Sequence, residues 1–324
     1  MRGLSPSFKI VFILLISFSF CSMAKKKQTT GSPIQHPVVG RKIQNSESMV
    51  SDLEKIVQQS GFKNNVGIFI AESQSESSAL LQVQPDHKLI PASISKIATA
   101  ATVLEKILPG TRLKTGLWSQ ASIQDGVLLG DLYLKGAGDP SFVSENMWVL
   151  VNNFTRQKIH TIQGDIVVDD SLFDELRFDP TRQDERVDRA YDAPVGAMSF
   201  NWNSINVYAR PGKKVADPAQ VFIDPENNYT HLISHVKTVE KCDDPCIQID
   251  RSFDAKEKKE IVTVHGKARI QQEGKKEILA FANITHPDLW SGENLKSFLA
   301  QRGIRVQGAV RAGKVKEAWM LLLA

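Results

Sequence analysis

The chain has 324 residues, of which 42% are hydrophobic and 23% charged, and its formal net charge at pH 7 is +4. This length and apolar content allow a substantial core and more than one domain, and they exclude an intrinsically disordered protein. The 40 basic and 36 acidic residues are spread along the chain. The charge therefore gives no indication of binding to nucleic acid or acidic polymers.

The N-terminus has the pattern of an export signal. Arg2 and Lys9 precede an apolar run from Ile10 to Phe20, and Ser22-Met23-Ala24 then offers the small residues that a signal peptidase requires. The run is too short for a membrane-spanning helix, which needs about 20 residues. We therefore predict a cleaved signal peptide at residues 1–24, a periplasmic protein, and no membrane span in the mature chain.

The three cysteines have different interpretations. Cys21 would anchor a lipoprotein, but the residue before it is bulky where a lipobox has a small one, so the anchor is the weaker alternative. Cys242 and Cys246 flank a Pro-containing turn, and an oxidising compartment would allow them to pair. Zinc is the weaker alternative for this pair. The nearest histidines, His231 and His235, lie four apart in a β-rich segment, where such residues are distant from each other.

The first folded elements are predicted after residues 25–45, which are basic and loop-like and are expected to form a flexible linker. Apolar spacing predicts a helix, two strands and a second helix, at residues 51–59, 66–70, 79–83 and 93–108. Pro109-Gly110 ends the second helix. Its apolar stripe is expected to anchor it in a core and consists of Ile97, Ala100, Ala101, Leu104, Ile107 and Leu108.

Beyond Leu113 the chain is predicted to be largely β. Short apolar runs predict strands at residues 126–134, 164–168, 205–209, 221–223, 261–264 and 278–282. Helical spacing predicts a last helix at residues 295–302. A few helices with many short strands predict an α+β protein.

Ser93 is the candidate nucleophile. Ser93-Ile94-Ser95-Lys96 matches the pattern S-x-x-K, which puts a lysine one helical turn after a serine on the same face. A serine hydroxyl needs a base to take its proton, and a lysine within hydrogen-bond reach can do so when its surroundings favour the neutral amine. The positive end of a helix dipole favours both that amine and the oxyanion of a tetrahedral intermediate.

The pattern itself is a weak signal, because it also occurs at residues 60–63 and 234–237. Only Ser93 follows a Pro-containing loop and opens an apolar helix. The alternative interpretation is that Ser93 is merely a helix N-cap and Lys96 a solvated residue of the first turn.

Several segments extend this pattern to nearly the whole chain after residue 24. They are residues 89–101 (LIPASISKIATAA), 130–141 (GDLYLKGAGDPS), 164–173 (GDIVVDDSLF), 191–194 (YDAP), 198–203 (MSFNWN) and 303–308 (GIRVQG). In content and order these segments resemble the DacB-type, class C low-molecular-mass penicillin-binding proteins. These proteins are D-alanyl-D-alanine carboxypeptidases and endopeptidases.

The resemblance implies a fold and a domain order. The expected fold is the N-terminal part of a penicillin-binding, transpeptidase-like (β-lactamase-like) domain with a large β-rich insertion. Residues 46–112 would form the N-terminal part of this catalytic domain, and residues 113–310 the inserted β-rich domain or domains. Residues 311–324 would be a truncated return to the catalytic domain.

The resemblance also implies an activity, that of a serine-type D-Ala-D-Ala carboxypeptidase or endopeptidase acting on the peptide stems of peptidoglycan. Ser93 would attack the carbonyl between the two terminal D-alanines, Lys96 would accept its proton, and water would hydrolyse the acyl-enzyme. β-Lactams would inhibit by acylating the same serine. No metal ion, organic cofactor or nucleic-acid partner is implied.

Two further motifs of the family, S-x-N and K-T-G, are expected after the β-rich insertion, and the sequence ends at Ala324 before either. Matches to these letters elsewhere are interpreted as unrelated to catalysis: Lys114-Thr115-Gly116, Ser144-Glu145-Asn146, Ser199-Phe200-Asn201 and Ser204-Ile205-Asn206. We therefore expect a truncated chain with impaired activity, since the K-T-G strand supplies an oxyanion-hole amide. Asp169 resembles an acidic position facing the active site in some members, but we interpret it as a strand-end turn residue.

Two alternatives remain for the function. A non-catalytic cell-wall or partner-binding protein would retain the inserted β domain without the catalytic half. A class A β-lactamase fits the S-x-x-K pattern but not the long β insertion, and it ranks last. The first alternative differs from the peptidase in whether Ser93 reacts with a penicillin.

Overall fold

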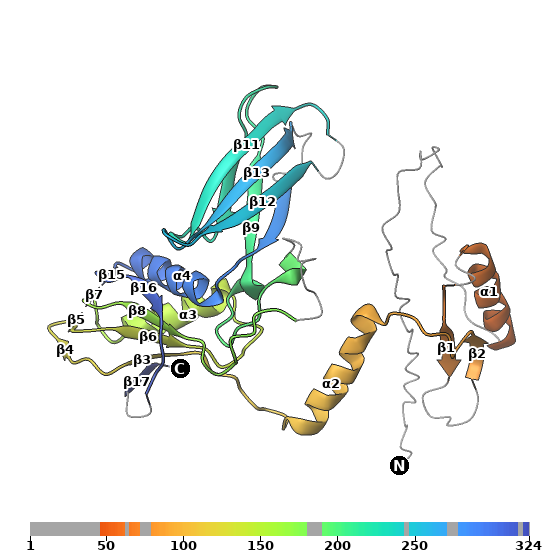
Figure 1. The fold of residues 1–324 in the computed structure, drawn as a ribbon, viewed down its shortest axis with the longest axis horizontal. Coiled ribbons are helices and arrows are strands. Elements are labelled where there is room, and N and C mark those ends of the chain that lie inside the picture. The colour runs from red at the N-terminus through yellow and green to blue at the C-terminus, as the bar shows by residue number, and fades with distance from the viewer. Residues whose placement is uncertain are drawn as a thin grey trace, which may run out of the picture. The chain divides into compact units, whose positions relative to one another are not determined.

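The computed structural model describes residues 46–61, 65–71, 79–179, 190–242, 246–270, 278–316 and 320–323. The predicted signal peptide and linker, residues 1–45, lie outside these ranges. The chain divides into two compact units, Met1–Thr111 and Arg112–Ala324, and its mixed helices and strands confirm the α+β class (Figure 1). The domain boundaries given above stay predictions.

The first unit contains the helix and the hairpin predicted from apolar spacing. Helix α1 spans Ser46–Gln59, and strands β1 (Ile68–Ala71) and β2 (Ala79–Val83) pair antiparallel, with Ile68 opposite Val83. Val66 and Leu81 are buried. The three predictions are confirmed. The helix begins at Ser46, before its predicted start, because its first turn is polar and has no apolar period that would predict it.

The second helix of this unit is also confirmed, but the burial of its apolar stripe is not. A 3-10 turn, η1 (Ala92–Ile94), leads directly into α2 (Ser95–Lys106), and none of these residues is buried. Leu104 and Leu108 are each 80% exposed. An apolar stripe predicts which face a helix can bury, but burial also needs a packed neighbour, and no described residue of the first unit covers this stripe.

The second unit is built on a five-stranded mixed sheet. Its strand order is β16-β8-β6-β3-β17, with bounds Val310–Ala312, Ile166–Asp169, Leu132–Lys135, Gly116–Ser119 and Met320–Leu323. Strands β6, β8 and β16 run parallel, whereas β3 is antiparallel to both β6 and β17. The last described part of the chain thus pairs with the first strand of the unit.

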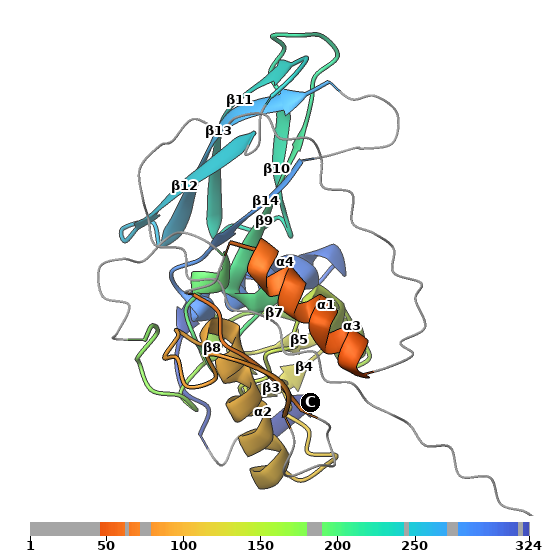
Figure 2. The same ribbon diagram turned by 90° about the vertical axis from the view of Figure 1, so that its right-hand side faces the viewer.

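Two helices, α3 (Ser144–Thr155) and α4 (Pro287–Gln301), enclose the core of this sheet (Figures 1 and 2). Fully buried side chains from both helices and the strands fill it: Leu117, Leu134, Met147, Phe154, Ile166, Trp290 and Leu295. The predicted helix at 295–302 is therefore the second half of α4. Among the described residues, no helix has both the length and the apolarity needed to cross a bilayer.

A small four-stranded sheet has the order β15-β7-β5-β4, with bounds Arg305–Val306, Thr161–Ile162, Val127–Leu128 and Ile123–Gln124. It corrects the prediction of one strand at residues 126–134, because β5 belongs to this sheet and β6 to the larger one. The chain turns between them at Gly130, whose carbonyl accepts the Gly164 N–H at 3.0 Å. Only Gly130-Asp131 separates the apolar runs 127–129 and 132–134, so the two runs look like one strand in the sequence.

Two further three-stranded sheets form the end of the unit drawn at the top of Figure 1. The first sheet has the order β10-β9-β14, with bounds Gln220–Asp224, Ser204–Arg210 and Ile278–Asn283. The second sheet has the order β11-β13-β12, with bounds Thr230–Val239, Lys259–Arg269 and Ile247–Asp254. The strands predicted at 205–209, 221–223, 261–264 and 278–282 lie within these elements. Between β11 and β12, Cys242 and Cys246 form a disulfide, which confirms the expected pairing.

A buried ion pair lies between these two sheets and the segment before α4. Glu260 is fully buried and Arg251 keeps 5% of its side chain exposed, with Nη1 2.5 Å from Glu260 Oε1. Tyr229 Oη donates to Glu260 Oε2 at 2.8 Å, the Thr285 N–H donates to the same oxygen at 2.9 Å, and Arg251 Nε donates to Asn283 Oδ1 at 2.6 Å. Burial and the adjacent Glu260 charge raise the pKa of the Tyr229 phenol. Both carboxylate oxygens therefore have donors.

A second charged cluster lies nearer the surface and is formed by Asp131, Asp165 and Arg311. It joins the residues just before β6 and β8 to strand β16. Arg311 Nε donates to Asp165 Oδ2 at 2.7 Å and Nη2 donates to Asp131 Oδ2 at 2.6 Å. The hydrogen bond from Arg311, with that from the Ala309 N–H, holds the pKa of Asp165 below its usual value. The carboxylate form is thus favoured in the folded protein.

This cluster predicts an acid-sensitive contribution to stability. A carboxyl with a lowered folded-state pKa stabilises the fold above its unfolded value of about 3.9, and that stabilisation is lost as the pH falls through the folded value. Since these side chains are partly exposed, we expect Arg311→Gln to cost about 1 kcal/mol or less at pH 6. The difference should shrink towards pH 3, as measured by urea unfolding. Arg305→Gln, an exposed arginine with no ion-pair partner among the described residues, is the matched control. A cost independent of pH would contradict the assignment.

Candidate active site

Ser93 lies in the 3-10 turn that opens α2. The turn follows Pro91, and its first residue, Ala92, has a positive φ of 45°. The Ile94 N–H donates to the Pro91 carbonyl at 2.9 Å, and Ser95 Oγ donates to the Ala92 carbonyl at 2.7 Å. The turn is thus closed by local hydrogen bonds, and Ser93 stands at the start of the helix as predicted.

Lys96 reaches back to Ser93. Its Nζ donates to Ser93 Oγ at 2.8 Å, and both side chains are exposed. A spacing of three residues puts the two side chains on one face of the helix. No carboxylate of the described residues lies within ion-pair distance of Lys96. The Lys96 amine therefore lies within proton-transfer distance of the Ser93 hydroxyl.

The sequence Lys114-Thr115-Gly116 lies at the start of β3 in the second unit. Thr115 is buried and Gly116 pairs with Lys135 of β6. These residues therefore belong to the packing of the five-stranded sheet. Their interpretation as unrelated to catalysis stays a prediction.

The sequence Ser199-Phe200-Asn201 is also structural. Asn201 Oδ1 accepts the Ser144 N–H at 2.9 Å, so it caps the first turn of α3, while its Nδ2 donates to Ser144 Oγ at 2.9 Å. Ser199 Oγ accepts from Asn203 Nδ2 at 3.0 Å, and Phe200 is fully buried. Two of the S-x-N matches thus hold each other in place, and Ser204-Ile205-Asn206 opens strand β9.

Asp169 ends strand β8 and is buried. Its Oδ1 accepts the Ser171 N–H at 3.0 Å and the Ser171 hydroxyl at 2.7 Å, and its Oδ2 accepts the Val315 N–H at 2.9 Å. One carboxylate oxygen is thus bound by the turn after the strand, and the other by the segment that follows β16. The prediction of a strand-end turn residue is confirmed.

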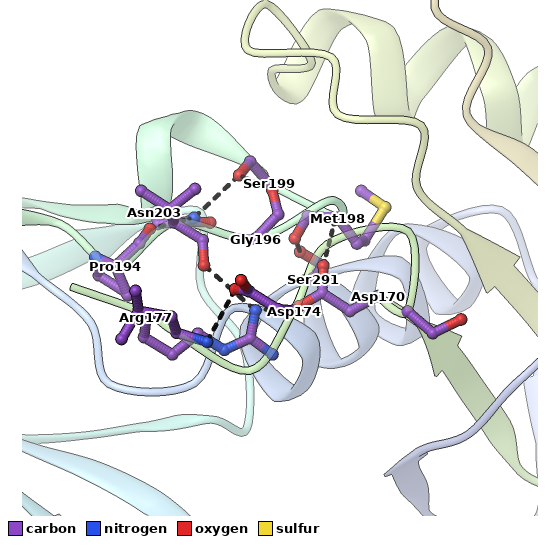
Figure 3. A network of polar contacts seen from close by, with 12 residues as sticks. Asp170, Asp174, Arg177, Pro194, Gly196, Met198, Ser199, Asn203 and Ser291 are labelled. Atoms are coloured by element: carbon purple, nitrogen blue, oxygen red, sulfur yellow. Dashed lines mark hydrogen bonds and ion pairs between the residues drawn. The ribbon is translucent and has the colours of Figure 1, made fainter. Parts of the chain in front are cut away.

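A polar network that the sequence did not predict lies beside this turn (Figure 3). Asp170 forms an ion pair with Arg177 and accepts the Met198 N–H, and Arg177 and Val195 exchange two hydrogen bonds of 2.8 and 3.1 Å. Burial raises the pKa of Asp170, although the Met198 N–H and Arg177 favour its charged form. Ser291 Oγ of α4 donates to the Met198 carbonyl at 3.4 Å.

This network connects segments that the family resemblance had singled out, namely residues 164–173 and 198–203. Gly136 belongs to a third such segment, residues 130–141. It packs so closely on the backbone at Ala197 that a Cβ atom on Gly136 would lie 2.3 Å from the Ala197 carbonyl oxygen. The described contacts of these segments are structural. Within the first unit, Ser93 and Lys96 are joined as the predicted chemistry requires.

The described residues contain no group of three or more His, Cys, Asp or Glu side chains that could hold a metal ion. His231 and His235 lie on strand β11, where residues four apart are separated by about 13 Å. The His235 ring stacks on the His265 ring at a centroid distance of 5.1 Å.

Comparison with known proteins identifies relatives. The family described as D-Ala-D-Ala carboxypeptidase 3 (S13) matches residues 49–324. A D-alanyl-D-alanine carboxypeptidase of Actinomadura sp. (strain R39) is 23% identical over 274 residues, which cover 83% of this chain and 49% of that protein. The D-alanyl-D-alanine carboxypeptidase DacB of Haemophilus influenzae is 25% identical over 273 residues, which cover 81% of this chain and 52% of that protein. The chain thus spans about half the length of these relatives.

Solved structures show the same fold. The crystal structure of penicillin-binding protein 4 (DacB) from Haemophilus influenzae superposes with a TM-score of 0.61 at 19% identity, covering 84% of this chain and 58% of that one. A second structure of that protein, in complex with a β-lactam, gives a TM-score of 0.51 at 20% identity and covers 72% of this chain and 49% of that one. The resemblance recognised in the sequence segments is confirmed, and so is the penicillin-binding-protein fold.

Proposed function

Because the chain belongs to the D-Ala-D-Ala carboxypeptidase 3 (S13) family, we propose that this protein is a serine peptidase that hydrolyses the bond between the terminal D-alanines of peptidoglycan peptide stems. The observation that carries the proposal is the 2.8 Å hydrogen bond between Lys96 Nζ and Ser93 Oγ at the start of α2. It joins a nucleophile to a base in a chain whose relatives are D-alanyl-D-alanine carboxypeptidases.

In the proposed reaction, Ser93 Oγ attacks the carbonyl carbon of the penultimate D-alanine while neutral Lys96 takes the hydroxyl proton. The tetrahedral intermediate collapses, the C–N bond breaks, and Lys96 returns the proton to the departing amine. The resulting Ser93 ester is then hydrolysed by water, which Lys96 deprotonates before giving the proton back to Ser93. The helix N-terminus favours the negative charge of both intermediates.

A β-lactam would follow the first half of this sequence. Its strained amide is attacked by Ser93, the ring opens, and the product stays attached as an ester. The support comes from the relative that was crystallised with a β-lactam. We also propose a periplasmic location, because the proposed substrate is peptidoglycan. The Cys242–Cys246 disulfide supports this location, since disulfides are typical of an oxidising compartment.

Labelling with a fluorescent penicillin tests the proposal directly. We expect the purified protein to acquire a covalent label that survives denaturing electrophoresis, and to release D-alanine from a synthetic peptide ending in D-Ala-D-Ala. Ser93→Ala should abolish both. Ser51→Ala is the matched control, because this exposed serine lies on α1, outside the turn that carries Ser93.

The contrary result is equally clear. If the protein is folded by circular dichroism and carries no label that depends on Ser93, the peptidase proposal fails. The non-catalytic cell-wall or partner-binding protein would then be the better interpretation.

A further inference from the structure

A shallow groove in the second unit lies along the C-terminal half of α3 and reaches the end of α4. It encloses about 520 Å³ and is lined by Trp148, Asn152, Asn153, Arg156 and Arg302, among others. This volume falls within the range of small-molecule sites, about 300 to 1,000 Å³. All these residues belong to one unit, so the groove is complete within it.

The groove offers an exposed indole. Trp148 is 54% exposed, although the same helix buries Met147 and Val151 in the core. Those buried neighbours anchor the helix that carries the ring, so Trp148 is presented at a defined place on the surface. An exposed, rigid aromatic ring is a common contact for a flat apolar ligand surface, such as the C–H face of a pyranose ring.

The groove also carries positive charge. Arg156 follows the last residue of α3 and Arg302 the last residue of α4, and both are exposed. None of the residues that line the groove is acidic, and neither arginine has an ion-pair partner among the described residues. Two guanidinium groups beside one ring favour a ligand with carboxylates, which arginine binds through paired hydrogen bonds.

Two side-chain amides also line the groove. Asn152 and Asn153 present groups that both donate and accept hydrogen bonds, as an acetamido substituent does. Asn152 Oδ1 is shielded from solvent and has no hydrogen-bond partner within the described part of the chain. Rotation of the terminal amide would bring an acceptor to the groove, where a ligand N–H or O–H could satisfy it.

We propose that this groove binds stretches of the peptidoglycan glycan strand from which the peptide stems have been removed, that is, a chain of N-acetylated amino sugars whose lactyl carboxylates are free. A sugar ring would stack on Trp148, its acetamido group would bond to Asn152 or Asn153, and carboxylates would pair with Arg156 and Arg302. The inference rests on the proposed function, which makes peptidoglycan the substrate. Holding the polymer by a second site would raise the local concentration of peptide stems for the same chain.

Binding is tested on the Ser93→Ala protein, so that no acylation interferes. The probe is peptide-free glycan released from peptidoglycan by an amidase, which leaves every lactyl carboxylate free. We expect saturable binding by calorimetry, and Trp148→Ala should weaken it about tenfold or more, the effect of losing one good aromatic contact. Trp202→Ala is the matched control, because Trp202 is 66% exposed and does not line the groove.

The arginines are tested separately by the double variant Arg156→Gln, Arg302→Gln. It should weaken glycan binding, reduce its dependence on salt, and remove the preference for this glycan over a neutral N-acetylglucosamine tetramer. This variant also keeps the inference testable if Trp148→Ala fails to fold.

Three results would overturn the inference: no glycan binding by a folded protein, equal effects of Trp148→Ala and Trp202→Ala, or Trp148-dependent binding of a stem peptide alone. Penicillin labelling of the unsubstituted protein, set beside glycan binding by the Ser93→Ala protein with Trp148 intact, separates this inference from the proposed function. Labelling without glycan binding would refute only the groove. Glycan binding without labelling would refute only the peptidase.

Discussion

Replacing Lys96 by methionine is expected to slow acylation of Ser93 by a fluorescent penicillin about 10² to 10⁴-fold, the usual contribution of a general base. The side chain keeps nearly the same length, but it cannot accept the proton that Ser93 must lose. The rate is measured by stopping the reaction at intervals and quantifying the labelled protein. Lys88→Met, which removes an exposed lysine from the loop before Ser93, should leave the rate unchanged.

A second substitution distinguishes a base from a mere cation. Lys96→Arg keeps the positive charge and hydrogen-bond donors but cannot be deprotonated in a protein. If Lys96 is the base, the arginine variant will be about as slow as the methionine variant. If Lys96 acts only by orienting Ser93 through the 2.8 Å contact, the arginine variant will retain most of the rate.

Replacing Glu260 by alanine is expected to lower the free energy of unfolding by about 3 to 5 kcal/mol, because Arg251 would be left as a buried charge without its partner. Tyr229 and Thr285 would lose their acceptor as well. For a domain of this size, each kcal/mol shifts the melting temperature by about 2–4 °C. Thermal and urea denaturation followed by circular dichroism measure the change.

Two controls show whether the effect comes from the unpaired charge. Glu257→Ala removes an exposed carboxylate from the turn between the same two strands and should cost less than about 0.5 kcal/mol. The double variant Arg251→Met, Glu260→Met should recover much of the loss, since it removes both charges and keeps the volume. A loss below about 1 kcal/mol in Glu260→Ala would show that water reaches Arg251 and that the pair is not effectively buried.

Elements with a clear apolar period were predictable from the sequence. Helices α1 and α2 and the hairpin β1–β2 follow directly from spacing, since each has apolar residues on one face and turn residues at its ends. Helix α3 was missed for a physical reason. Its run Met147-Trp148-Val149-Leu150-Val151 is continuously apolar, because the helix buries one side and exposes Trp148 and Val149 on the other. Such a run has no visible period.

Strands β11 and β12 were not predicted as strands of a sheet because most of their side chains are exposed or half-exposed, so alternation of apolar residues is weak. Strand β13 lies between them, and backbone hydrogen bonds to β13 fix the positions of both strands. Which strands become neighbours is a property of the whole unit, and local sequence carries little information about it.

The contacts of the candidate site and its surroundings also differ in whether the sequence predicts them. The contact between Ser93 and Lys96 follows from a spacing of three residues, so the sequence predicted it. The links from Asp170 to Met198 and from Arg311 to Asp131 join residues far apart in the sequence, and no local pattern indicates them. Family resemblance identified their segments but not their contacts.

The pairing of β3 with β17 has a consequence for how the protein is made. Leu117 lies opposite Leu323, so one edge of β3 stays unpaired until nearly the whole sequence shown here has been synthesised. Until then its open N–H and C=O groups are available to other chains. Closing so distant a contact is slow compared with forming a helix. During biosynthesis this edge therefore stays open to pairing with other chains until the last neighbour of β3 has been made.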